Sequence, residues 1–127
     1  MLMEHDPLSH AVIGCAMRVH TKLGPGFLES VYKNALAIEL RKSGLSFEAE
    51  RPVQVFYDAI PVGTFSVDIL VEAKLLLELK AVQRIAVEHE VQVVNYLTAT
   101  GIDHGLLLNF GGSSLEFKRK FRKPKGI

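Results

Sequence analysis

Two carboxylates and one lysine occur at spacings that could bring them together on neighbouring strands. Asp68 lies in an apolar, partly β-branched run over 64–71, and Glu78 and Lys80 lie in a second run over 75–82. Three residues separate the two runs, which is typical of an antiparallel β-hairpin with a short loop. The spacing therefore predicts that the three charged side chains lie on adjacent strands.

The register of this hairpin decides whether the charges meet. A pairing of Val71 with Leu75 places Asp68 directly opposite Glu78, with Cβ atoms about 4.5–5.5 Å apart on one face. Lys80 lies two residues beyond Glu78 and therefore points to the same face. A register that is shifted by one residue would put the two acids on opposite faces.

The apolar neighbours of these charges predict a hairpin that is covered on both sides. Leu70 and Leu76 are expected to share the face of the acids, and the other face is expected to hold Val67, Ile69, Val71, Leu75, Leu77 and Leu79. Like charges buried opposite each other repel, and a divalent cation such as Mg²⁺ or Mn²⁺ would compensate them. The alternative is a structural ion pair between Lys80 and one acid, with the other acid reaching solvent.

Two predicted helices carry further polar groups. Glu29 and Tyr32 lie three residues apart on a helix that begins near Phe27, and they share a face. Gln92 and Tyr96 lie four residues apart on a later helix. From position alone, Glu29 is a first-turn acid that interacts with the helix dipole, and Tyr96 packs in the core with its hydroxyl satisfied.

Three short motifs resemble those of one nuclease group. Asp68 followed by Glu78-Leu79-Lys80 across a hairpin resembles the PD-(D/E)XK nuclease signature. Residues 26–32 read G-x-x-E-x-x-Y, which resembles the GxxExxY protein family, a small-domain branch of that superfamily. Residues 92–96 resemble the Q-x-x-x-Y motif of RecB-like nucleases. The similarity spans roughly residues 12–110.

This resemblance implies roles for the candidate residues. The implied catalytic set is Asp68, Glu78, Lys80, Glu29 and Gln92. Asp68, Glu78 and Glu29 would bind Mg²⁺ or Mn²⁺, and Lys80 would orient or activate the attacking water. Gln92 would hold a metal-bound water or the Lys80 ammonium, and Tyr96 would contact a phosphate or stack on a base.

The elements that must position these residues follow from periodicity and turn signals. We expect a helix that starts at 7–9 with Ser9 as its cap and ends at 24–26, and a second helix that ends at 43–44. Strands are expected at 47–57, 64–71, 75–82, 106–110 and 115–121, with a turn at 59–63 and a helix at 86–100. This order predicts an α/β sandwich on a mixed sheet of four or five strands. The resemblance implies a restriction-endonuclease-like fold with helices on both faces.

Composition limits the class of protein. The chain has 127 residues, 48% hydrophobic and 23% charged, which is typical of one globular domain over 1–127. Cys15 is the only cysteine, which excludes an intramolecular disulfide and a four-cysteine zinc site. The apolar runs are too short to cross a membrane, and residues 1–10 do not resemble a secretory signal. We therefore expect a cytoplasmic location.

The net charge of +1 conceals a basic end at 118–127. This segment contributes six cations and no acid, namely Lys118, Arg119, Lys120, Arg122, Lys123 and Lys125. We expect a tail in which Lys118, Arg119, Lys120 and Arg122 contact nucleic-acid phosphates, because such contacts release condensed counterions. The alternative is a solvated tail that keeps the protein soluble.

Three functions remain in competition at this stage. The leading hypothesis is a metal-dependent nuclease that acts on nucleic acid, with DNA favoured over RNA. The second is a non-catalytic nucleic-acid-binding or protein-interaction module that retains the nuclease fold. The third is a homodimer, which would suit cleavage of both strands of a duplex.

Overall fold

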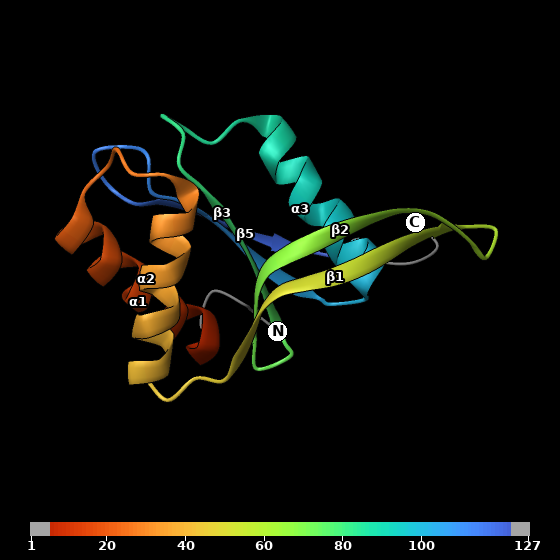
Figure 1. Cartoon of the computed structure of the whole chain (residues 1–127), viewed down its shortest axis with the longest axis horizontal. Coiled ribbons are helices and arrows are strands. Elements are labelled where there is room, and N and C mark those ends of the chain that lie inside the picture. The colour runs from red at the N-terminus through yellow and green to blue at the C-terminus, as the bar shows by residue number, and fades with distance from the viewer. Residues whose placement is uncertain (1–5, 123–127) are drawn as a thin grey trace.

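The computed structural model describes residues 6–122. The helices are α1 (Pro7–Leu23), α2 (Glu29–Lys42) and α3 (Val87–Thr100). The strands are β1 (Phe47–Tyr57), β2 (Ile60–Val71), β3 (Leu75–Lys80), β4 (His104–Asn109) and β5 (Glu116–Phe121). The strands form one sheet in the order β1-β2-β3-β4-β5, in which β3 and β4 are parallel and the other neighbours are antiparallel (Figure 1).

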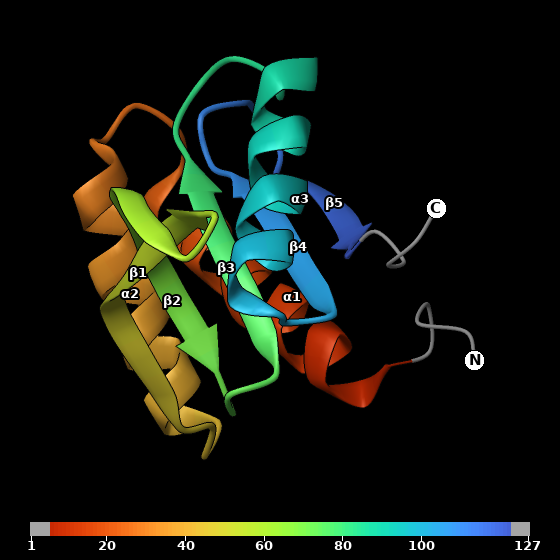
Figure 2. The same ribbon diagram turned by 90° about the vertical axis from the view of Figure 1, so that its right-hand side faces the viewer.

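The sheet separates two layers of helices. Helices α1 and α2 cover one face, and α3 lies across the other (Figure 2). Leu77 belongs to the larger hydrophobic cluster beneath α1 and α2, whereas Leu76 belongs to the smaller cluster beneath α3. The predicted mixed sheet with helices on both faces is confirmed. In residues 6–122, no helix has the length and apolar character required to cross a membrane.

The N-cap of helix α1 lies three residues earlier than the sequence predicts. Asp6 is the N-cap, and its Oδ1 accepts a hydrogen bond from the Leu8 N–H at 3.1 Å. Pro7 follows the cap, where its fixed φ suits the first turn and its missing N–H costs nothing. The prediction of Ser9 as the cap is wrong, because Ser9 is buried inside the helix and donates to the Asp6 carbonyl at 3.2 Å.

Helix α2 begins at Glu29, two residues after the predicted start. Phe27 and Leu28 precede it in an extended loop, and they are 49% and 77% exposed. The buried face of the helix is formed by Tyr32, Leu36, Glu39 and Leu40. Glu29 is therefore the first residue of the helix, at the rim of the molecule.

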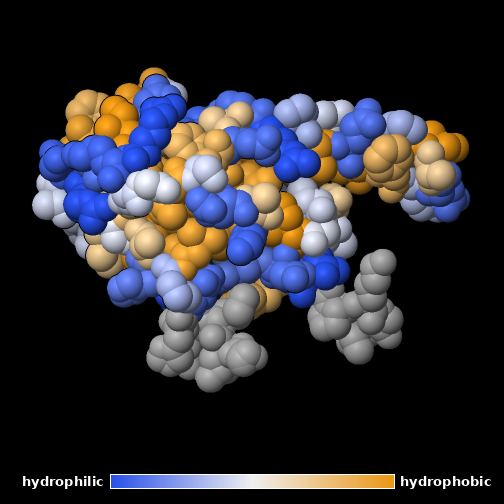
Figure 3. Space-filling view, turned by 90° about the horizontal axis from the view of Figure 1, so that it is seen from below, coloured by the Kyte–Doolittle hydropathy of each residue, from blue (hydrophilic) through white to orange (hydrophobic). Residues whose placement is uncertain are grey.

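Strands β1 and β2 form a long arm that extends beyond the helices (Figure 1). The predicted turn at 59–63 is wrong, because the chain reverses at Asp58-Ala59, both of which have positive φ. Pro61 lies within β2 and is paired with Phe56 where the register of the arm shifts. Hydrophobic and hydrophilic surface are mixed at the end of the arm (Figure 3), and its exposed large hydrophobic side chains are Val55, Phe56, Tyr57, Ile60 and Val62.

The basic segment is not a tail over its first part. Residues 116–121 form β5, which pairs with β4 along its whole length. The prediction of a tail is therefore wrong for 118–121, because this segment pairs with β4, Phe117 packs against the hydrophobic core and Phe121 stacks on His104. Residues 123–127, with Lys123 and Lys125, lie outside the described residues.

Candidate active site

The predicted register of the β2–β3 hairpin is confirmed. The paired residues are Val71 with Leu75, Leu70 with Leu76, and Ile69 with Leu77. Beyond these pairs the backbone ladder between the two strands ends. The Leu79 N–H is instead bonded by the side chain of Asp68, whose Oδ2 accepts it at 2.8 Å. The two strands therefore separate at Asp68, whose carboxylate lies against β3. We call this place, with Asp68 on β2 and Glu78 on β3, the β2–β3 split.

The alternation of side chains along β2 is interrupted at the same place. Val67 and Leu70 both belong to the cluster beneath α3, although strict alternation would put them on opposite faces. The prediction that Val67 faces the other way is wrong. On the neighbouring strand β1, the pairing skips Glu50, whose φ of 58° lies in the left-handed region. This local irregularity in both strands redirects the side chains of Asp68 and Glu50.

Glu78 is the most perturbed carboxyl group of the site. Its side chain is 9% exposed, its Oε2 lies 3.7 Å from the Lys80 Nζ, and its Oε1 has no hydrogen-bond partner within residues 6–122. Burial and, to a lesser extent, the nearby Asp68 charge raise the pKa of Glu78 to about 8, against the opposing effect of Lys80. The ion pair with Lys80 therefore does not compensate the burial of this carboxylate, and without another cation Glu78 is mostly protonated at pH 7.

Sequence reasoning missed two residues of the site, Lys33 and Glu50. The Lys33 Nζ lies 3.7 Å from the Asp68 Oδ1 and also forms an ion pair with Glu50. Lys33 comes from α2, one turn after Glu29, so the helical spacing from Glu29 is a signal that could have found it. Glu50 has no such signal, because its position depends on the irregularity in β1.

The loop before α2 presents Glu29 to the same region. The Tyr32 hydroxyl donates to the Gly24 carbonyl at 2.6 Å and accepts from the Phe27 N–H at 3.1 Å. Tyr32 thus closes the loop, which gives the G-x-x-E-x-x-Y spacing a structural reason. Partial burial raises the pKa of Glu29, with Asp68 acting in the same direction and Lys80 against it. Glu29 is therefore near both of these residues.

Helix α3 brings Tyr96 to the acids and places Gln92 one turn earlier. The Tyr96 ring stacks on Phe65 with centroids 3.9 Å apart. Burial raises the pKa of Tyr96, and the charges of Glu78 and Asp68 add to the effect. Gln92 is half-buried, and in the described part of the chain its side chain makes no hydrogen bond to the acids. The Tyr96 ring is thus held against Phe65 at the edge of the cluster beneath α3, close to the acids.

A buried amide fixes the chain that follows β3. Asn109 is fully buried at the end of β4, and its Oδ1 accepts from the Val82 N–H at 2.9 Å. Its Nδ2 donates to the Glu116 Oε1 at 3.0 Å, and that oxygen also accepts from the Ile85 N–H at 2.9 Å. Sequence reasoning missed this network, although a single Asn at the end of the apolar run 106–110 was a usable signal.

The sequence of this domain, with its acids at the separated strands, also matches a known family. Residues 6–120 match the PD-(D/E)XK nuclease superfamily. The chain belongs to this superfamily. Among solved structures, the chain is similar to the crystal structure of SSO0001, with a TM-score of 0.62 and 13% sequence identity. The match covers 76% of this chain and 52% of that one, so the chain spans about half the length of SSO0001. Among curated proteins, none matches the sequence.

Nucleases of the PD-(D/E)XK superfamily typically use divalent metal ions, and the residues here fit such an ion. The Oε1 of Glu78 is a buried oxygen without a hydrogen-bond partner in residues 6–122, and Asp68 supplies a second carboxylate near it, so a cation would compensate both charges. Within residues 6–122, no three His, Cys, Asp or Glu side chains form a ready-made metal cage. Two carboxylates completed by water are the donor set that Mg²⁺ accepts.

Two of the predicted basic residues, Lys120 in β5 and Arg122 just after it, have acidic partners within this PD-(D/E)XK domain. Lys120 forms an ion pair with Glu90 of α3 at 2.9 Å, and Arg122 forms one with Asp103 at 2.6 Å. Arg119 is half-buried, whereas Lys118 is exposed. The structure therefore does not bring these four cations to the acids of the β2–β3 split as one group, and their contact with nucleic acid stays a prediction.

Proposed function

We propose that this protein is a metal-dependent nuclease that hydrolyses phosphodiester bonds of nucleic acid, with DNA as the favoured substrate. The observation that carries the proposal is the buried Oε1 of Glu78, which has no partner in residues 6–122 and lies beside Asp68 in a PD-(D/E)XK domain. A carboxylate that is buried without compensation is costly to folding, and a divalent cation between the acids removes that cost.

The side chains around the split have separate tasks in this proposal. Asp68 and Glu78 hold Mg²⁺ or Mn²⁺, and Glu29 reaches it directly or through water. Bound there, the ion lowers the pKa of a water molecule and stabilises charge on the phosphoryl oxygens. The Lys80 ammonium, which lies 3.7 Å from the Glu78 carboxylate, orients the attacking water and stabilises the transition state.

Two groups on α3 complete the site. Gln92 holds a water or the Lys80 ammonium, and Tyr96 contacts a phosphate or stacks on a base. Both assignments rest on the shared face of α3 and on the position of Tyr96 close to the acids. Within the superfamily, we assign the chain to the GxxExxY branch because Tyr32 and Glu29 keep that spacing. We also retain the cytoplasmic location as a prediction.

Calorimetric titration with Mn²⁺ tests the metal site directly. We expect one class of site in the wild type and loss of binding in Asp68→Ala, because that variant lacks one of the two carboxylate ligands. Circular dichroism of Asp68→Ala checks that the variant remains folded. Absence of Mn²⁺ binding to the wild type, or equal binding by Asp68→Ala, would contradict the proposal.

The second candidate is a non-catalytic module that binds nucleic acid or protein. The ion pairs of Lys33 with Asp68 and of Lys80 with Glu78 favour it, because the lysines neutralise part of the acidic charge without a metal. Cleavage assays on single-stranded, duplex and branched DNA with Mg²⁺ and Mn²⁺ separate the two candidates. Persistent inactivity together with salt-sensitive binding would favour the module. The homodimer remains a prediction, which sedimentation of the concentrated protein tests.

A further inference from the structure

Lys33 is placed between two acids that belong to different strands. It extends from α2 toward the sheet, and its side chain is 23% exposed. Its ammonium contacts Glu50 on β1 and lies 3.7 Å from the Asp68 Oδ1 on β2. The cation therefore sits against the carboxylate that the proposed function assigns to the metal.

An ammonium in this position competes with a divalent ion for Asp68. Opposite charges a few ångströms apart attract by several kcal/mol near a protein surface, and like charges repel as strongly. When a divalent ion binds Asp68, its charge therefore drives the Lys33 ammonium away from this carboxylate. Glu50 remains as its second partner and keeps the ammonium at the site.

Glu50 has an unusual backbone conformation and is more exposed than Asp68. A backbone in the left-handed region costs a residue other than glycine about 1 kcal/mol or more, and Glu50 adopts it at the irregularity opposite Asp68. The Glu50 side chain is 55% exposed, whereas that of Asp68 is 16% exposed. A Lys33 ammonium that moves from Asp68 toward Glu50 therefore moves toward solvent, where a substrate approaches.

We propose that Lys33 is a substrate-binding residue, held by Asp68 and Glu50 in the metal-free protein and contacting a phosphate of the nucleic acid when a metal ion binds Asp68. This inference rests on the proposed function. A lysine ammonium is a compact charge that suits a phosphate oxygen.

The test uses Lys33→Gln in two measurements that should respond in opposite directions. In Mn²⁺ titration without nucleic acid, we expect the variant to bind the ion roughly three- to tenfold more tightly, because a competing positive charge is gone. In fluorescence anisotropy with Mn²⁺ and a DNA duplex carrying hydrolysis-resistant phosphorothioate linkages, we expect about tenfold weaker binding. The slope of log affinity against log salt should fall by about one.

Lys42→Gln is the matched control. Lys42 lies on the same helix, and its Nζ is also 3.7 Å from a carboxylate oxygen, that of Glu39. It is nine residues from Lys33, which is about 13 Å along the helix. The control removes the same net charge, and we expect it to leave both affinities unchanged. Lys33→Arg should retain the binding of DNA, since it keeps the charge.

A second variant keeps the inference testable if Lys33→Gln folds poorly. Glu50→Gln leaves Lys33 with Asp68 as its only acid, so Mn²⁺ should bind more weakly than to the wild type. Unchanged Mn²⁺ and DNA affinities in Lys33→Gln, or effects equal to those of Lys42→Gln, would overturn the inference while leaving the nuclease proposal standing. Failure of the wild type to bind Mn²⁺ would instead overturn the proposed function.

Discussion

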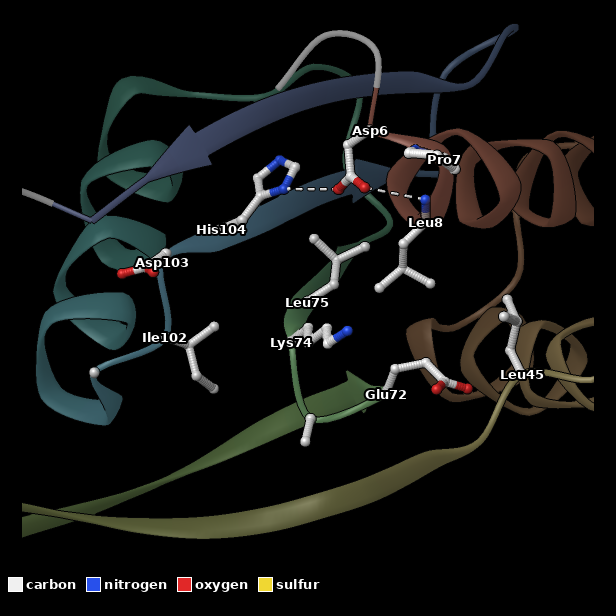
Figure 4. A pocket seen from close by; sticks show the side chains of 12 residues that line it. Asp6, Pro7, Leu8, Leu45, Glu72, Lys74, Leu75, Ile102, Asp103 and His104 are labelled. Atoms are coloured by element: carbon white, nitrogen blue, oxygen red, sulfur yellow. Dashed lines mark hydrogen bonds and ion pairs between the residues drawn. The ribbon is translucent and has the colours of Figure 1, made fainter. Parts of the chain in front are cut away.

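Charged side chains cluster at both ends of the parallel strand pair β3–β4, but the acids at the two ends differ in their partners and in their pKa values. At the start of these strands lies an open cleft of about 930 Å³, lined by Asp6, Glu72, Asp103 and His104 among others (Figure 4). At the far end, where β2 and β3 separate, lie Asp68 and the buried Glu78.

The acids of the large cleft all have local partners. Asp6 caps α1 and lies 3.3 Å from the His104 Nδ1, as Figure 4 shows. Glu72 accepts hydrogen bonds from the Ser46 N–H and hydroxyl, and the backbone bond is the main reason that its pKa is lowered. Asp103 is bound by Arg122. Their charges stabilise the fold and do not require a ligand.

The acids of the β2–β3 split show the opposite behaviour. Glu78 retains a buried oxygen without a partner, and its pKa rises to about 8 because of burial and the neighbouring Asp68. The contrast teaches that the volume of a cavity is a poor guide to chemistry in this molecule. The state of the charges is a better guide, because a buried carboxyl group with a strongly raised pKa marks a candidate functional site.

The largest expected effect is on the rate of DNA cleavage, which should depend on the acids of the split and not on those of the cleft. We expect Asp68→Asn and Glu78→Gln each to lower the rate of DNA cleavage about a thousandfold, because each removes a charge from the proposed metal site. Glu72→Gln in the cleft removes an equal charge and should leave the rate unchanged. A gel-based cleavage assay with Mg²⁺ measures all three, and a large loss in Glu72→Gln would break the comparison.

The hairpin at the split was predictable because its register depends on neighbours in the sequence. Val71 and Leu75 flank a short loop, so their pairing follows from local geometry alone. The parallel pairing of β3 with β4 and the place of β5 at the edge involve residues distant in the chain, and the sequence indicated only that such strands exist.

The position of Glu50 in the site was not predictable from the sequence. Glu50 reaches Lys33 because β1 departs from regular geometry opposite Asp68, and no residue type in that segment announces the departure. The predicted tail is instead β5 over 116–121, where Phe117 packs against the core and Phe121 stacks on His104. The aromatic residues within a basic run are therefore a stronger signal than its net charge.

The pH dependence of the free energy of unfolding should also distinguish Glu78 of the split from Glu72 of the cleft, and this measurement needs no substrate. Glu78 has a folded pKa of about 8 against an ordinary value of 4.5, so between these values the folded chain keeps a proton that the unfolded chain releases. The stability due to this group is therefore complete below pH 4.5 and is lost as the pH rises to 8.

Urea unfolding at pH 5.5 and 8.5 in the presence of a chelator measures this loss. We expect the wild type to lose roughly 3 kcal/mol more than Glu78→Gln over that interval. Glu72→Gln should follow the wild type here, because the lowered pKa of Glu72 affects stability only in more acidic solution. Parallel curves for the wild type and Glu78→Gln would contradict the assigned burial of this charge.

A bound metal ion should raise the free energy of unfolding, and this gain should depend on the acids of the split and not on those of the cleft. At a Mn²⁺ concentration a hundred times the dissociation constant, we expect the wild type to gain about 2.7 kcal/mol in free energy of unfolding. Glu72→Gln should gain the same amount and Glu78→Gln much less. Thermal melts with and without Mn²⁺ provide the measurement. Equal gains for Glu78→Gln and the wild type would place the ion away from the split.

The smallest effect concerns the cap in the cleft. Asp6→Ala should lower the free energy of unfolding by about 1 kcal/mol, since the Leu8 N–H loses its acceptor. Asp6→Asn should cost less, because Asn is also a good cap and burial lowers the pKa of His104, which leaves that ring mostly neutral at pH 7. Urea unfolding at pH 7 distinguishes the two variants, and both should cleave DNA at the wild-type rate. If Asn costs as much as Ala, the contact with His104 is the one that matters, and the charges of the cleft are more strongly coupled than their separate partners indicate.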